Sequence, residues 1–301
     1  MLRELGHSVL NGLIHPVVHG GWTSEAMVRS TNRTEVTMKT SRKSNKEYRG
    51  YHWRVEHRNS FNGIFEWDAD LVDLVLRVCP IPDGGSVLDL GCAGGDQAKL
   101  FAERGYQVTG VDYVKALIAY AKNTFSEHGL TGDFVVGDMR EIVYEDRFDL
   151  CVLLSGAFGY FSDIGNHDLL VRILRVIKVG GYAFVDYNSA EYWARRERSR
   201  DWLEFAGGIT LTEFWFDVPT STCRGSYKSV LPDGEVVEFA GDDGNSFEVI
   251  RCYGAREIEN LAERVGFELV EHLTMDHITN PTYQADFSDP RKMIVLRKPA
   301  R

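Results

Sequence analysis

A short apolar segment that opens into a glycine-rich loop is the feature that most constrains the fold of this chain. Residues 86–90, SVLDL, have the length and apolar character of a buried strand, and GCAGG follows at 91–95. Residues 96–103 then carry apolar side chains at helical spacing. A glycine loop between a strand and a helix lets the backbone approach a ligand closely. We therefore expect a ligand to bind at residues 91–95.

Strand-like and helix-like segments continue to alternate along the chain. Further strands are expected at 106–112, 133–138, 147–154, 181–187, 267–274 and 293–298, and further helices at 67–78, 114–125, 167–178 and 254–266. Alternation of this kind favours parallel strands joined by crossover helices on both faces of one sheet. The predicted fold class is α/β, with a doubly wound, mostly parallel, seven-stranded sheet. Ligands of such sheets bind at the carboxyl ends of the strands.

The pattern changes after the fifth strand. Residues 209–218, 225–231 and 235–240 alternate apolar and polar side chains, and the turn sequence LPDGE separates the last two segments. We predict an antiparallel β insertion over residues 200–250. Phe214, Trp215 and Phe216 would give it an apolar face.

The N-terminal region differs from the rest of the chain in composition. Nine Lys or Arg residues and three Asp or Glu residues lie between Arg29 and Arg58, in a Ser/Thr-rich context with little apolar periodicity. We predict a mobile N-terminal arm at residues 1–47 and a folded domain at residues 48–301. His15, Pro16 and His19 interrupt the only apolar stretch near the N-terminus, so no signal peptide or membrane span is expected.

Charge and cysteine usage exclude several classes of function. The formal net charge of −10 would repel phosphate backbones, which disfavours nucleic acid as a partner. The five cysteines are odd in number and never form a C-x-x-C pair, so neither a metal site nor a disulfide framework is expected. Free cysteines within apolar runs are typical of a reducing compartment, so the predicted location is cytoplasmic.

Three acidic residues stand at or near the ends of neighbouring expected strands. Asp89 lies inside the apolar strand 86–90, where an unpaired carboxylate would be costly, so a ligand or a buried partner is expected. Asp112 ends the next strand and Asp138 follows the third. The loop has glycine at 91, 94 and 95, which departs from the G-x-G-x-x-G pattern of dinucleotide-binding proteins.

Residues 86–97, SVLDLGCAGGDQ, resemble the first motif of the class I S-adenosylmethionine (SAM) dependent methyltransferases, acid-x-G-x-G-x-G after an apolar strand. Ala93 stands where that family usually has its middle glycine. The resemblance covers roughly residues 67–187 and resumes at the C-terminal strands. It implies a Rossmann-like fold, SAM as the cofactor and methyl transfer as the activity. Residues 251–267, RCYGAREIENLAERVGF, resemble a pattern of small-molecule N- and O-methyltransferases.

The resemblance also implies roles for single residues. Asp89 is expected to reach the SAM ammonium group, Asp112 to accept both ribose hydroxyls and Asp138 to accept the adenine amino group. The backbone amides of Gly91 and its neighbours are expected to approach the methionine part. The remaining predicted cofactor-binding residues are Cys92, Ala93, Gly95, Tyr113, Met139, Leu154, Ser155 and Tyr51.

Methyl transfer from a sulfonium needs alignment, exclusion of water and, for a protonated acceptor, a base. His52 and Tyr160 are the predicted catalytic residues. The predicted substrate-binding residues are Tyr48, Phe158, Tyr160, Tyr187, Asn188 and Arg251, with the alternative that Arg251 anchors the start of the helix at 254–266.

The predicted function is methylation of nitrogen or oxygen of a small molecule. The insertion would contribute to the acceptor pocket or to a homodimer contact. Two alternatives stay open: an RNA or protein methyltransferase, supported only by the basic arm, and a SAM-binding module without turnover.

Overall fold

A seven-stranded sheet forms the centre of the computed structural model, which describes residues 40–44, 65–205, 208–240, 248–274 and 291–300. Its strands run in the order β12-β13-β6-β5-β2-β3-β4. Their bounds are β2 (Ser86–Leu90), β3 (Gln107–Asp112), β4 (Gly132–Val136), β5 (Phe148–Phe158), β6 (Ile177–Asn188), β12 (Glu268–Thr274) and β13 (Arg291–Arg297). Strands β2 to β6 pair in parallel, and β13 runs antiparallel to both β6 and β12. The predicted fold class is confirmed.

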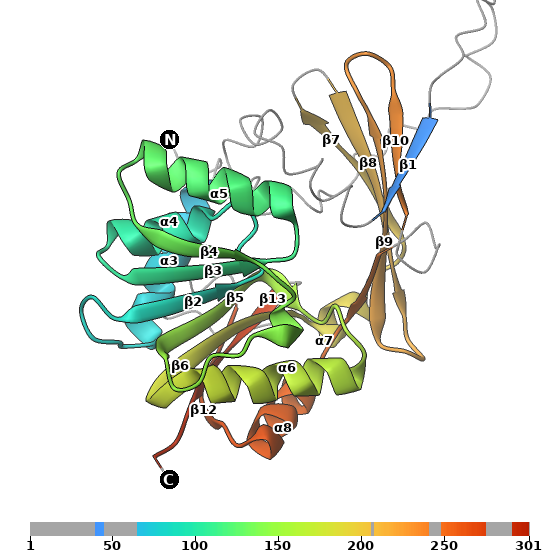
Figure 1. The fold of residues 1–301 in the computed structure, drawn as a ribbon. Helices are drawn as coiled ribbons and strands as arrows, with labels where there is room; N and C mark the ends of the chain where they lie inside the picture. The colour runs from blue at the N-terminus through green and yellow to red at the C-terminus, as the bar shows by residue number, and fades with distance from the viewer. Residues whose placement is uncertain (1–39, 45–64, 206–207, 241–247, 275–290, 301) are drawn as a thin grey trace, which may run out of the picture.

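Helices cover both faces of this sheet (Figure 1). On one face lie α3 (Phe65–Val78), α4 (Asp96–Glu103) and α5 (Lys115–Glu127), and on the other lie α6 (Asp163–Val176) and α8 (Ala255–Val265). Successive residues of β2 face opposite layers, since Val87 packs into the core cluster of the first face and Leu88 into that of the second. Burial on both faces explains why consecutive residues of β2, Val87 and Leu88, are both apolar.

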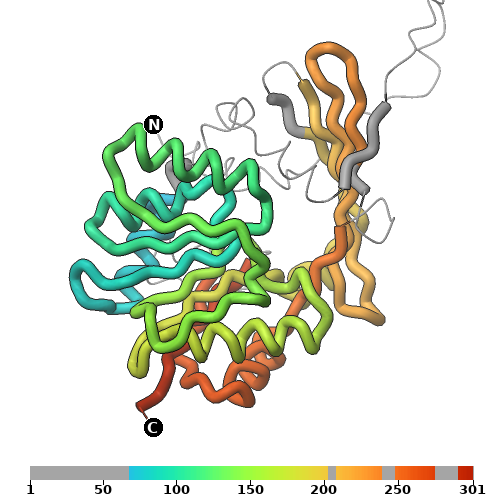
Figure 2. The backbone as a smooth tube through the Cα atoms, in the orientation of Figure 1, coloured from blue at the N-terminus to red at the C-terminus, as the bar shows by residue number. Residues whose placement is uncertain are grey.

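A second sheet stands beside the first and is built mainly from the predicted insertion (Figure 1). Its strands are β7 (Ser199–Phe205), β8 (Gly208–Asp217), β9 (Thr222–Val230), β10 (Val236–Ala240), β11 (Glu248–Arg251) and β1 (Thr40–Ser44). The chain leaves the main sheet after β6, passes α7 (Ala190–Trp193), and returns to it through α8 (Figure 2). The antiparallel insertion after the fifth strand of the main sheet is confirmed.

Strand β1 was not predicted, because it lies within the expected N-terminal arm. Thr40–Ser44 pairs in parallel with Val236–Ala240 of β10. An edge strand offers unpaired backbone groups to any extended segment, whatever its side chains, so hydrophobic periodicity does not reveal such pairing. Among the described residues, no helix is both long and apolar enough to cross a membrane.

Candidate active site

The glycine loop between β2 and α4 is hydrogen-bonded to the end of β3. The N–H groups of Gly91 and Cys92 donate to the carbonyl oxygen of Val111 at 2.8 and 3.2 Å, and the Ala93 N–H donates to Asp112 Oδ2 at 3.1 Å. Gly91, Ala93 and Gly95 all have positive φ, at 74°, 46° and 80°. The loop therefore turns sharply and holds its shape through β3.

These bonds correct two expectations. The amides of Gly91 and Cys92 serve the loop itself, so they are not directed at the methionine part of SAM. The Cys92 side chain is only 2% exposed and packs beneath Gly110, where an added Cβ would come within 2.8 Å of the sulfur. Gly91 contributes space, because a Cβ there would lie 3.3 Å from Met139 Cε and 3.6 Å from Ala157 Cβ.

Ala93 is the one non-glycine residue of the loop with positive φ. A left-handed backbone conformation costs an L-residue with a Cβ about 1–2 kcal/mol. An Ala93→Gly variant avoids that cost, but glycine loses more backbone entropy on folding, so only part of the cost is recovered. We expect Ala93→Gly to raise the free energy of unfolding by roughly 0.5–1 kcal/mol, measured by urea denaturation. Ala98→Gly, within α4, is the opposite control and should destabilise the protein.

Asp89 is a buried carboxylate with an unsatisfied oxygen. Its side chain is 2% exposed, and Oδ2 has no hydrogen-bond partner. Burial, assisted by the nearby charges of Asp112 and Asp68, raises the pKa of Asp89 to about 7. A cationic group placed beside Asp89 would repay this cost. The ammonium group of SAM fits that requirement.

Asp68 is a site residue that the sequence pattern did not reveal. It lies on α3, accepts a hydrogen bond from Gln97 Nε2 of α4 at 2.9 Å, and adds its negative charge to that of Asp89 and Asp112. An acidic residue in the first turn of a helix has no distinctive sequence spacing. Only the packing of α3 against α4 brings Asp68 close to Asp89. Within the described ranges, no group of three or more His, Cys, Asp or Glu side chains is arranged to hold a metal ion.

Asp112 ends β3 with its carboxylate oriented by the backbone. Its Oδ1 accepts from the Val114 N–H at 2.8 Å while Oδ2 accepts from Ala93, and the residue is 8% exposed. A carboxylate has about four acceptor positions. The geometry is therefore compatible with acceptance of ribose hydroxyls, with the added role of locking the loop.

Asp138, on the expected adenine side, is held by Arg140, whose role no sequence motif indicates. It caps the short helix η1 (Met139–Glu141) and accepts from the Arg140 backbone at 2.8 Å. The Arg140 guanidinium lies 2.6 Å from Asp138 Oδ2, which holds the pKa of this carboxyl below its usual range. Arg140 also stacks on the Phe161 ring, with its guanidinium carbon 4.4 Å from the ring centroid. Arg140 thus keeps Asp138 ionised and oriented.

The end of β5 borders the glycine loop between β2 and α4 through Ala157. Ser155 is exposed and has a φ of 57°, whereas Leu154 is 5% exposed and packs in the core. Ser155 is thus accessible near the end of β5, and Leu154 contributes mainly to packing. Tyr113 and Tyr160 are half-buried, at the ends of β3 and β5 respectively.

Two predicted substrate residues belong to the core instead. Phe158 is fully buried and packs on Tyr253, with 5.4 Å between ring centroids. Tyr187 is 1% exposed, and its hydroxyl lies 3.4 Å from His272 Nε2 on β12. Both side chains pack in the cluster formed with α6 and α8. Strands buried on both faces show no polar alternation, so the sequence could not reveal which face each aromatic side chain occupies.

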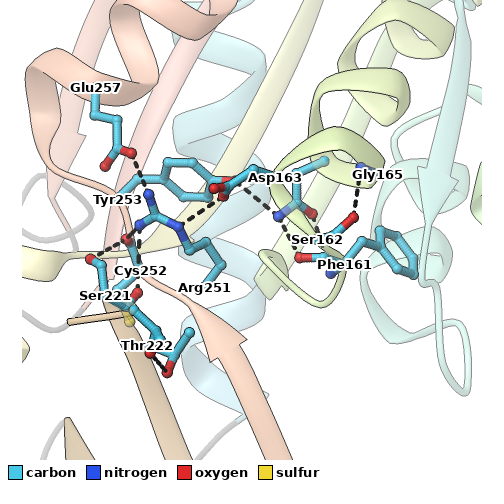
Figure 3. Close-up of polar contacts among 12 residues, drawn as sticks. Phe161, Ser162, Asp163, Gly165, Ser221, Thr222, Arg251, Cys252, Tyr253 and Glu257 are labelled. Atoms are coloured by element: carbon cyan, nitrogen blue, oxygen red, sulfur yellow. Dashed lines mark hydrogen bonds and ion pairs between the residues drawn. The ribbon is translucent and has the colours of Figure 1, made fainter. Parts of the chain in front are cut away.

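Arg251 makes the contacts of an anchor, which is the alternative that the sequence left open. Its Nε lies 2.9 Å from Asp163 Oδ1, and Nη2 contacts Glu257, so the side chain joins the first turns of α6 and α8 (Figure 3). The guanidinium also covers the Tyr253 ring at 4.6 Å. The two backbone N–H groups of Arg251 and Tyr253 donate to the carbonyls of Gly159 and Asn188 at 2.8 and 2.9 Å. This segment therefore fastens the insertion to the ends of β5 and β6.

The other candidates are placed as follows. Asn188 ends β6 half-buried, with Nδ2 3.4 Å from the position of a Cβ on Gly156. Tyr48, Tyr51 and His52 lie outside the described residues.

Fold and site together define a class of protein. Acidic side chains at the ends of β2 and β3, beside a glycine loop of a doubly wound sheet, suit a ligand that has a cation at one end and a nucleoside at the other. SAM is such a ligand, and Asp89 and Asp112 fit its ammonium and ribose groups.

Comparison with known proteins agrees with this class. Residues 87–181 match the family model described as a methyltransferase domain. The demethylmenaquinone methyltransferase of Thermotoga maritima is 26% identical over 198 residues, which are 63% of this chain and 80% of the relative. Residues 87–181 therefore form a methyltransferase domain, and the site described above fits SAM as its cofactor.

Two solved structures share the fold. An S-adenosylmethionine-dependent methyltransferase from Clostridium acetobutylicum superposes with a TM-score of 0.66 at 14% identity, over 81% of this chain and 99% of the other. The sugar N-methyltransferase KedS8 from Streptoalloteichus superposes with a TM-score of 0.59 at 20% identity, over 95% and 100%. The latter match spans nearly the whole chain, the second sheet included.

Proposed function

We propose that this enzyme methylates a nitrogen or oxygen atom of a small molecule in the cytoplasm. The observation that carries the proposal is the buried carboxylate of Asp89, whose Oδ2 has no hydrogen-bond partner among the described residues. Strand β2, which holds Asp89, pairs directly with β5. The net charge of −10 disfavours a polyanionic macromolecule as substrate. KedS8 is named for a sugar nitrogen acceptor and the Thermotoga relative for a quinone, which supports a small acceptor.

The proposed mechanism assigns separate tasks to the two halves of the sheet edge. SAM, when bound, would supply a methyl group on a positively charged sulfur for transfer to the acceptor atom. Asp89 and Asp68 hold the ammonium end, Asp112 orients the ribose, and Asp138 faces the adenine. The proton released by the acceptor passes to a base, for which Tyr160 and His52 are the candidates.

The second sheet is proposed to form part of the acceptor pocket. Its last strand, β11, is fastened at Arg251 to Gly159, directly after β5. The alternative role of this sheet is a homodimer contact. The N-terminal arm is proposed to span residues 1–47. The aromatic and histidine candidates that would cover the cofactor, Tyr48, Tyr51 and His52, follow it directly in the sequence.

The test is a screen of fractionated cell extract with the full-length protein and methyl-labelled SAM, followed by mass identification of labelled products. We expect label in a small molecule, and no label with Asp89→Asn. Label recovered in RNA or protein would overturn the small-molecule assignment. Binding of SAM without any labelled product would identify a binding module without turnover.

A further inference from the structure

The end of β5 contains a large bulge over β6. Leu153 pairs with Val185 and Phe158 pairs with Tyr187, so residues 154–157 of β5 stand opposite the single residue Asp186 of β6. Within this bulge Ser155 and Gly156 have φ values of 57° and 71°. The left-handed conformation at Ser155 is strained, and such strain persists only where the surroundings enforce it. Because Ala157 lies against Gly91, the bulge also packs on the glycine loop between β2 and α4.

Asp186 fills the space beneath the bulge. Its side chain is fully buried, and neither carboxylate oxygen makes a hydrogen bond of good geometry. The N–H groups of Ser155 and Gly156 nevertheless lie near enough to oppose the effect of burial, which raises the pKa of this carboxyl. The carboxylate therefore attracts the backbone of the two left-handed residues directly.

Arg291 is the charged partner of this carboxylate. It begins β13 opposite Asn188, and its Nη1 lies 3.3 Å from Asp186 Oδ2. Its Cδ is 3.9 Å from the position of a Cβ on Gly156. Arg291 thus touches the bulge and the buried carboxylate at once, and three neighbouring strands meet in this one contact.

We propose that Asp186, together with Arg291, is a positioning residue that holds the bulge at 154–157 in the shape that presents Ser155 to the acceptor side of the site. A buried ion pair adds little net stability, because desolvation offsets its attraction. The effect of the pair is therefore geometric: it draws in the N–H groups of Ser155 and Gly156 and turns the Ser155 side chain outward. Donor binding depends on other acids, at β2 and β3.

The opposite end of the same strand supplies a matched control. Asp149 of β5 lies 2.8 Å from Lys178 of β6 and accepts from the Ser86 N–H at 2.8 Å. This pair also joins neighbouring strands of the main sheet, but it lies at the amino edge, away from the bulge. Asp149→Asn removes a comparable interaction without touching residues 154–157.

The test is hydrogen exchange of the full-length protein, read by mass spectrometry on peptides that contain residues 154–157. Asp186→Asn and Arg291→Gln should each speed exchange of these amides by about tenfold or more, since a charge-assisted interaction is lost. The double variant should add little to either single change. Affinity for S-adenosylhomocysteine, measured by calorimetry, should change less than about threefold, because the acids at β2 and β3 on which donor binding depends are left in place.

The outcomes separate positioning from general stability. Unchanged exchange at 154–157 in folded Asp186→Asn and Arg291→Gln proteins would overturn the inference, as would equal acceleration in Asp149→Asn. If Asp186→Asn fails to fold, Arg291→Gln alone decides, because Arg291 is partly exposed. Any effect of these variants on the rate of methyl transfer rests on the proposed function, whereas the exchange rates and the affinity for S-adenosylhomocysteine do not depend on it. A failure of the acceptor screen therefore leaves this test intact.

Discussion

Asp89→Asn is expected to weaken SAM binding roughly 30- to 1,000-fold, because it removes the buried negative charge that pairs with the ammonium group of the ligand. The same substitution should stabilise the ligand-free protein at pH 8. A buried carboxylate with an unsatisfied Oδ2 is a cost to folding that the neutral amide avoids in part. Loss of affinity combined with gain of stability identifies a residue that serves the ligand rather than the fold.

The raised pKa of Asp89 sets the pH range of both effects. Its pKa is about 7 in the folded protein, against an ordinary value of 3.8. Only the carboxylate attracts the ammonium group, so wild-type affinity should fall below pH 7 by about tenfold per pH unit. Folding favours the protonated form, so its stabilising contribution is complete below the ordinary pKa and is lost as the pH rises through 7. The gain from Asp89→Asn should therefore appear at pH 8, at up to about 4 kcal/mol, and vanish near pH 4.

Calorimetric titration with S-adenosylhomocysteine, which keeps the ammonium group, measures the affinity from pH 5 to pH 8. Scanning calorimetry of the ligand-free protein measures the stability. Asp133→Asn is the control, because Asp133 lies at the amino edge of β4 and its side chain is 74% exposed. An affinity that is flat with pH and equal in Asp89→Asn would contradict the assignment of Asp89 to the ammonium group.

Asp112→Ala is expected to cost roughly 2–5 kcal/mol of SAM binding, which corresponds to about 30- to several-thousandfold weaker affinity. The structure adds a second expected result. Because Asp112 also accepts from the Ala93 and Val114 N–H groups, the variant should release the loop between β2 and α4. Exchange of the Ala93 amide should accelerate in Asp112→Ala even without ligand.

Asp112→Asn separates the two roles. Its amide oxygen can still accept one of the two backbone bonds, so loop exchange should rise less than in Asp112→Ala, while the loss of charge still weakens ligand binding. Titration with S-adenosylhomocysteine and exchange of residues 91–95 are the measurements. Unaltered affinity in Asp112→Ala would be incompatible with a ribose contact.

Several features of the site followed from local sequence. The apolar length of 86–90 and the glycines at 91, 94 and 95 predicted the strand and the turn that the structure contains, because burial on both faces and a left-handed backbone each demand particular residue types. Asp89 stood out because a charge inside an apolar strand needs a partner. The antiparallel insertion followed from its period-two alternation.

Residues brought together across elements were not predictable in the same way. Asp68 joins the site through helix packing, Arg140 through a cap, and Asp186 through a break in strand register. Phe158 and Tyr187 were assigned to the acceptor because of where their strands end, but they face the core.

The sequence alone thus determined the sheet, the glycine loop and the acid at Asp89, since each depends on composition and spacing within a few residues. Tertiary structure decided which strand-end side chains face the sheet edge, how the bulge over Asp186 is held, and what Arg251 does. Those outcomes depend on register and on contacts between distant segments, and a charged residue is an anchor or a ligand contact according to the partners that the fold places around it.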